Sequence, residues 1–285
     1  MLEWLLSPLS YTFMQRGLLA AVLVGILCAV IGCYVVLRSM AFLGDALAHA
    51  ILPGVAIAYL LGGNLLIGAL VAALVVALSI SFLSRKGDVK EDTAIGILFS
   101  AALALGVALI SSIRTYAVDL SHILFGNVLG VSSANLWLIA ILTVIVLSIL
   151  LVLYRPLLVV SFDPVLATTL RLPTSLLRST LLVLLAITIV VSLQTVGISL
   201  VAAMLVTPGA TAYLLTRRLP IMMLLSGLLG TLASIIGLYI SYYLNIVSGS
   251  AIVLVSTLFF LLAFFFAPRR GLAWNIFHHK PIGAK

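Results

Sequence analysis

The chain has 285 residues, of which 64% are hydrophobic and only 8% are charged, whereas a soluble globular domain carries roughly a quarter charged residues. This composition excludes an ordinary soluble domain. It predicts an all-α polytopic integral membrane protein, because a helix of about 20 apolar residues satisfies its own backbone hydrogen bonds in a lipid bilayer. The net charge of +8 comes from 15 Lys and Arg residues that are scattered between apolar runs, a pattern that sets membrane topology and excludes a nucleic-acid-binding protein.

Nine apolar runs predict nine transmembrane helices, and eight is the alternative count because the sixth and seventh runs are short. The runs cover residues 17–37, 40–61, 65–83, 93–113, 136–153, 179–193, 197–215, 221–244 and 251–267. They place residues 1–267 in one transmembrane domain and leave residues 268–285 as a short cytoplasmic tail, which we expect to be disordered.

Linkers rich in Lys and Arg alternate with linkers that have almost none. Such residues concentrate on the cytoplasmic side of a membrane, so the pattern predicts nine spans with the N-terminus outside and the C-terminus inside. With eight spans the N-terminus would lie inside. The basic linkers and the tail hold Arg38, then Arg85, Lys86 and Lys90, then Arg155, Arg171 and Arg178, then Arg217 and Arg218, then Arg269, Arg270, Lys280 and Lys285.

The second run holds Asp45, which alone among the seven acidic residues lies within a predicted span. His49 follows at i+4, so both side chains share one helical face. A charge at the bilayer centre costs at least about 3 kcal/mol on insertion scales, which favours a pore or binding-site residue. A carboxylate oxygen and an imidazole nitrogen are ligands that suit manganese, iron or zinc. The alternative is a pair that only hydrogen-bonds within the bundle.

Two prolines predict breaks in the second and seventh runs. Pro53 has no N–H for the carbonyl of His49, so a kink and a free backbone oxygen are expected beside the histidine. Pro208 and Gly209 predict a similar break in the seventh run. Paired interruptions are typical of transporters with broken helices that line a path, although Pro and Gly are common in membrane helices generally.

The inner linker, residues 155–178, is the largest predicted cytoplasmic feature. Asp163 suits a helix N-cap and Pro164 a first helical turn, and Arg171 to Pro173 end the segment. The pattern predicts a helix of about two turns at the cytoplasmic surface. From the residues alone, it is either a docking element or a simple interfacial linker.

The remaining polar features carry weaker predictions. In the outer linker, residues 122–131 predict a short interfacial or re-entrant helix. Asp119 and His122 are expected in an ordinary exposed loop, and the alternative is a second ligand pair on the outer face. His278 and His279 lie in the polar tail. The sequence has no Gly-x-x-x-x-Gly-Lys-Ser/Thr phosphate loop, so any transport powered by ATP requires another chain.

Four segments in order along the chain resemble one family of membrane proteins, the metal-ion permeases of ATP-binding-cassette importers. The segments are RSMAFLGDALAHAILPGVAIAY at 38–59, EDTAIGILFS at 91–100, SFDPVLATTLRLP at 161–173 and VSLQTVGISLVAAMLVTPGATAYLLT at 191–216. Gly-Asp-Ala around Asp45 and Leu-Pro-Gly around Pro53 are more similar to the manganese-type branch than to the zinc and iron permeases. Arg171 departs from the family pattern, which favours glycine there.

The resemblance implies a transport subunit, not an enzyme, in the bacterial cytoplasmic membrane. A homodimer would line a shared ion path with two copies of Asp45 and His49. The segment with Asp163, Pro164, Leu166, Leu170 and Arg171 would enter a groove on a separate ATPase, and an extracytoplasmic binding protein would deliver the ion. The expected cargo is a divalent metal, manganese before zinc or iron, with no permanently bound cofactor.

Two other functions remain as alternatives. An ion-coupled secondary transporter would use Asp45 and His49 as a relay and would need no ATPase. A membrane scaffold that transports nothing would tolerate replacement of Asp45.

Overall fold

The computed structural model describes residues 7–84, 89–112 and 128–267, and every regular element in these ranges is a helix. The elements are η1 (Pro8–Ser10), α2 (Thr12–Leu37), α3 (Phe42–Ala50), α4 (Leu52–Leu60), α5 (Leu65–Leu83), α6 (Glu91–Ser111), η3 (Val128–Gly130), α8 (Ser133–Val152), α9 (Tyr154–Phe162), α10 (Pro164–Thr169), α11 (Thr174–Val196), α12 (Ile198–Leu215), α13 (Leu219–Leu244) and α14 (Ser248–Phe266). The tail 268–285 and most of the predicted outer helix lie outside the described residues.

The helices confirm the all-α polytopic fold, since each of the nine predicted runs is helical. Among the described residues, eight helical segments are long and apolar enough to cross a membrane, with α3 and α4 together forming one of them. The seventh run, α12, contains a shorter apolar helix, Leu200–Leu215. Side-chain caps fix several helix starts: the Asn64 carboxamide accepts from the N–H of Leu66 at 2.9 Å, and the Ser132 hydroxyl accepts from the N–H of Asn135 at 3.2 Å.

The helix α2 is the centre of the bundle and packs against α8, α12 and α13. Small residues allow close approach, because a methyl group on Gly32 would clash with the backbone carbonyl of Leu205 in α12. Two hydroxyls join α2 to α13: Ser226 donates to the carbonyl of Ala29 at 2.8 Å, and Ser234 donates to the carbonyl of Ala21, about two turns earlier in α2, at 3.0 Å. Short-range packing and hydrogen bonds therefore hold this half of the bundle together.

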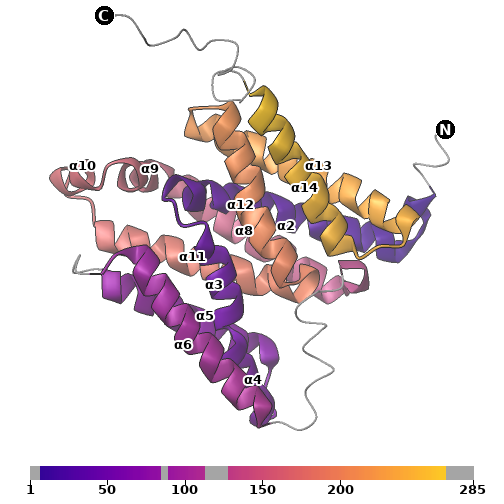
Figure 1. Ribbon diagram of the computed structural model, residues 1–285, viewed down its shortest axis with the longest axis horizontal. Helices are drawn as coiled ribbons and strands as arrows, with labels where there is room; N and C mark the ends of the chain where they lie inside the picture. The colour runs from indigo at the N-terminus through magenta and orange to yellow at the C-terminus, as the bar shows by residue number, and fades with distance from the viewer. Residues whose placement is uncertain (1–6, 85–88, 113–127, 268–285) are drawn as a thin grey trace, which may run out of the picture.

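A second group of helices, α3 to α6, lies beside this central set (Figure 1). Helix α4 packs against α5 and α6, and α3 packs against α6 and α12. Helix α11 lies between the two groups and contacts α5 and α3 on one side and α2, α8 and α12 on the other. Helix α3 thus contacts helices of both groups.

The two prolines that predicted breaks behave differently. At Pro53 the break is confirmed: α3 ends at Ala50, and Pro53 lies in the first turn of α4, where the missing N–H has no helical acceptor to serve. At Pro208 the predicted break is wrong, because α12 continues through it from Ile198 to Leu215. A single proline removes one hydrogen bond, and a packed membrane helix tolerates this loss.

Candidate functional site

Asp45 and His49 lie one turn apart on α3, as their spacing predicts. The Asp45 Oδ1 and His49 Nε2 atoms are 3.6 Å apart, too far for a good hydrogen bond. The side chain of Asp45 is 46% exposed and that of His49 is 25% exposed in the single chain. The pair is therefore open to its surroundings, and neither group is enclosed by the chain that carries it.

The opposite face of α3 holds the pair in place. Ala46, Leu47 and Ala48 are buried, and a methyl group on Gly44 would lie 3.0 Å from the Leu205 side chain of α12. On the other side, the His49 ring lies near Phe99 of α6, with ring centroids 6.0 Å apart. The imidazole is thus positioned between α3 and α6 while one edge stays accessible.

The backbone after His49 leaves the helical path. The N–H of Ile51, the C-cap residue of α3, is directed at the His49 carbonyl. This contact spans only two residues and is not among the backbone hydrogen bonds of good geometry, so the free oxygen beside His49 stays a prediction. The kink itself still turns α4 away from the axis of α3 directly beside the pair.

Close packing fixes α4 after the kink. A methyl group on Gly54 would clash with the carbonyl oxygen of Gly68 in α5, and the reverse is also true. On the other side, a methyl group on Gly106 of α6 would lie 2.7 Å from the Cβ atom of Leu52. Backbone contacts to two helices thus set the direction of α4.

The chemistry available from one chain is a carboxylate oxygen and an imidazole nitrogen. In the part of the chain that the structure describes, no group of three or more His, Cys, Asp or Glu side chains could hold a metal ion. Transition-metal sites need at least three or four ligands. A metal bound between Asp45 and His49 therefore requires ligands beyond the His, Cys, Asp and Glu side chains of the described residues. Asp119, His122, His278 and His279 lie outside the described residues.

The predicted short helix of the inner linker is α10. The Asp163 carboxylate accepts from the backbone N–H groups of Val165 at 3.0 Å and Leu166 at 2.9 Å, which is the expected N-cap. Leu166 and Leu170 expose about half of their surface to solvent. Arg171 adopts a left-handed backbone conformation with φ of 56°, the position at which the family pattern favours glycine.

The inner linker also contains α9, which the sequence analysis missed. The helix spans Tyr154–Phe162 and buries Leu157 and Val160. Pro156 makes this helix hard to recognise from the sequence, although a proline in the first turn is compatible with a helix start.

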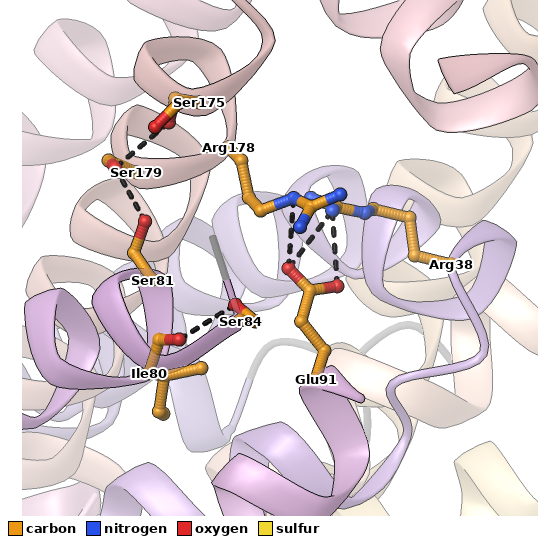
Figure 2. A network of polar contacts seen from close by, with 8 residues as sticks. All are labelled: Arg38, Ile80, Ser81, Ser84, Glu91, Ser175, Arg178 and Ser179. Carbon is orange, nitrogen blue, oxygen red and sulfur yellow. Dashed lines mark hydrogen bonds and ion pairs between the residues drawn. The ribbon is translucent and has the colours of Figure 1, made fainter. Parts of the chain in front are cut away.

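A cluster of three charged side chains was also missed. The Glu91 carboxylate at the start of α6 accepts from the Arg38 Nη2 atom at 3.1 and 3.2 Å, and the Arg178 Nε atom lies 3.1 Å from Glu91 Oε1. Figure 2 shows both guanidinium groups converging on this one carboxylate. Sequence analysis assigned both arginines to topology alone, and the only signal was an acid at the start of an apolar run.

These contacts also bear on the predicted topology. Arg38, Glu91 and Arg178 come from three linkers or span ends that the Lys and Arg distribution places on the cytoplasmic side. Their contact agrees with that placement, since groups on opposite sides of a bilayer about 30 Å thick cannot form ion pairs.

Comparison with known proteins gives matches along nearly the whole chain. The model of the ABC 3 transport family matches residues 10–267. The manganese transport system membrane protein MntC of Halalkalibacterium halodurans is 52% identical over 272 residues, which cover 95% of this chain and 93% of that relative. A probable iron transport system membrane protein of Haemophilus influenzae is 40% identical over 263 residues, covering 92% of this chain and 97% of the relative. The solved structure of PsaBC from Streptococcus pneumoniae in complex with Fab superposes with a TM-score of 0.84 at 39% identity, covering 96% of this chain and 98% of that one.

Proposed function

Because the chain belongs to the ABC 3 transport family, we propose that it is the permease subunit of an ATP-driven importer that carries manganese into the cytoplasm. It is a multi-pass protein of the bacterial inner membrane. It is a transport subunit, and ATP hydrolysis belongs to a separate partner chain. The observation that carries the proposal is the 52% identity to a manganese transport protein over 95% of the chain.

The ion is the finer part of the proposal. The names of two relatives mention manganese and iron, and one carboxylate with one imidazole suits both of these ions and zinc. We assign manganese because the relative with the higher identity of these two is described as a manganese transport protein. Competition between the ions decides the assignment experimentally.

Asp45 and His49 are the proposed metal ligands. A carboxylate that is nearly half exposed in the single chain is costly if it faces lipid, so a second copy of the chain is the proposed cover. In a symmetric dimer, two carboxylates and two imidazoles would meet at the twofold axis, enough ligands for a four-coordinate site. Affinity at this site is expected to be modest, because a transported ion must also leave.

Two partners complete the importer in this proposal. The segment from Asp163 to Pro173 presents the exposed Leu166 and Leu170 to the cytoplasm, and a groove on the ATPase would receive it. An extracytoplasmic binding protein would deliver the ion to the opposite face. The kink at Pro53 lies between α3, which carries the proposed ligands, and α4, which continues to the outer end of the span. A change in the angle of α4 would open or close the ion path at this point.

The test uses cells that lack their own manganese permease and measures uptake of radiolabelled manganese. Asp45→Asn keeps the shape of the side chain and removes its charge, so uptake is expected to be abolished while the amount of inserted protein stays unchanged. His49→Ala is expected to do the same, and the double variant adds little because the two residues act as one unit. Near-normal uptake by either single variant would show that the ion path lies elsewhere.

A second experiment separates the importer from a secondary transporter. The purified chain is reconstituted in vesicles with and without the ATPase, and uptake of manganese, iron and zinc is compared. The proposal requires uptake to depend on the ATPase and on ATP. Uptake by the chain alone would support an ion-coupled carrier instead.

A further inference from the structure

The Glu91 carboxylate pairs with arginines from two segments of the proposed transporter, the end of α2 and the start of α11. Arg38, one of its partners, caps the end of α2 and leads through a short turn into α3, which carries Asp45 and His49. Arg178, the other partner, lies in the second turn of α11. Helix α11 begins at Thr174, directly after the segment proposed to dock on the ATPase. One carboxylate therefore joins the turn that precedes α3, the helix of the proposed metal ligands, to α11, the helix that follows the proposed docking segment.

The helix of Glu91 also reaches the ion site itself. From Glu91 to Phe99, α6 is continuous over eight residues, which corresponds to about 12 Å. Phe99 contacts the His49 ring at a centroid distance of 6.0 Å. A shift of α6 at its ion-paired end would therefore displace both the His49 imidazole, through Phe99, and the turn before α3, through Arg38.

The environment of the cluster makes the carboxylate indispensable to both arginines. The Arg38 side chain is only 8% exposed. Burial lowers the pKa of Arg38 from its usual value, Glu91 opposes this effect, and the positive charge of Arg178 adds to it. Without Glu91, the nearly buried Arg38 guanidinium would lose its partner and keep the positive charge of the 27% exposed Arg178 beside it, and an unpaired buried charge destabilises a protein.

A neighbouring contact ties the same part of α11 to α5. The hydroxyls of Ser81 and Ser179 are 2.6 Å apart, and Ser179 donates to the carbonyl of Ser175. Figure 2 shows this chain of hydroxyls beside the ion pairs. The first turns of α11 are thus held to both α5 and α6, so movement of α11 cannot occur without moving its neighbours.

We propose that Glu91 is a positioning residue that transmits movement of the docking segment to the Asp45 and His49 pair, through Arg178 on one side and Arg38 on the other. A buried ion pair is often no more stabilising than an apolar replacement of similar volume, so net stability alone does not account for this cluster. This inference rests on the proposed function, since it requires an ATPase at the docking segment and an ion at the pair.

The experiment measures manganese uptake and ATP hydrolysis in the same vesicles, reconstituted with the permease and its ATPase. Glu91→Gln keeps the side-chain shape and removes the charge. The matched control is Asp92→Asn, the next residue along α6, which is exposed. Mutations along a coupling route change coupling by a few-fold to a few tens of fold, so Glu91→Gln is expected to lower manganese transported per ATP by about tenfold. Asp92→Asn is expected to match the wild type, and Glu91→Asp to restore part of the ratio.

A purely structural role is separated by a binding measurement on the same purified variants. Glu91→Gln is expected to bind manganese with unchanged affinity, because Asp45 and His49 are intact. If the variant does not fold, Arg178→Gln replaces it, since this change leaves the pair of Arg38 and Glu91 balanced and still removes the link to α11.

Three outcomes overturn the inference. A wild-type ratio of manganese to ATP in Glu91→Gln or in Arg178→Gln shows that coupling takes another route. Loss of manganese affinity in Glu91→Gln shows that the carboxylate maintains the resting shape of the ion site and does not transmit movement. A wild-type permease without ATP-dependent uptake overturns the proposed function itself, and the inference with it.

Discussion

The crossing of α4 and α5 leaves no room for a methyl group, so Gly54→Ala should disturb the span that carries Asp45 and His49. A Cβ atom on Gly54 would clash with the carbonyl oxygen of Gly68 and lie 2.6 Å from the Cβ atom of Ala72. The obstacle is backbone, which cannot move aside as a flexible side chain can. Overpacking of this kind costs about 1–3 kcal/mol, partly offset by the gain of about 1 kcal/mol when alanine replaces glycine in a helix.

Gly96 provides the matched control, because it also lies inside a membrane helix but has no heavy atom within 4 Å of its added Cβ. Gly96→Ala should therefore gain helix propensity with no packing cost. The two variants should differ in stability by roughly 1–3 kcal/mol, which corresponds to roughly 2–12 °C in Tm. Thermal unfolding of the purified proteins in detergent, followed by circular dichroism, measures the difference. Equal Tm values would refute the reasoning from the crossing.

Three further predictions concern the docking segment and the topology. Replacing Leu166 and Leu170 by Glu should release the ATPase during purification while the permease stays inserted, and retained co-purification with normal uptake would show that α10 is not a docking element. Arg171→Gly should raise the Tm, because the left-handed conformation at φ of 56° costs a side chain about 1–2 kcal/mol that glycine avoids; a lower Tm would mean that the arginine side chain stabilises this turn. A reporter that is active only in the cytoplasm should be active when fused after Arg218 and silent when fused near Asn245, and the reverse pattern would contradict the nine-span topology.

Local rules predicted the spans and the common helical face of Asp45 and His49 well. Apolar runs specify membrane helices because, in a bilayer without water, backbone N–H and C=O groups must hydrogen-bond to each other. The i, i+4 spacing placed Asp45 and His49 on one face of α3. The helix starts were less accurate: α2 begins at Thr12 rather than at residue 17. Hydropathy locates the hydrocarbon region, and a helix can continue beyond it.

The missed features depend on contacts between distant parts of the chain. Arg38 and Glu91 are 53 residues apart, so no local pattern identifies them as partners. At Pro208 the local rule predicted a break, but the helix continues because its neighbours support it; a methyl group on Gly209 would lie only 3.3 Å from the backbone carbonyl of Gly32 in α2.

The open position of Asp45 and His49 on a single chain has a genetic consequence. If two copies each contribute half of the ligands, an inactive allele does more harm than a missing one. A cell that makes both wild-type chain and an Asp45→Asn chain would assemble mixed pairs with three of four ligands, and only pairs of two wild-type chains would carry the ion. The allele would therefore behave as dominant over the normal gene, whereas a deletion would be recessive.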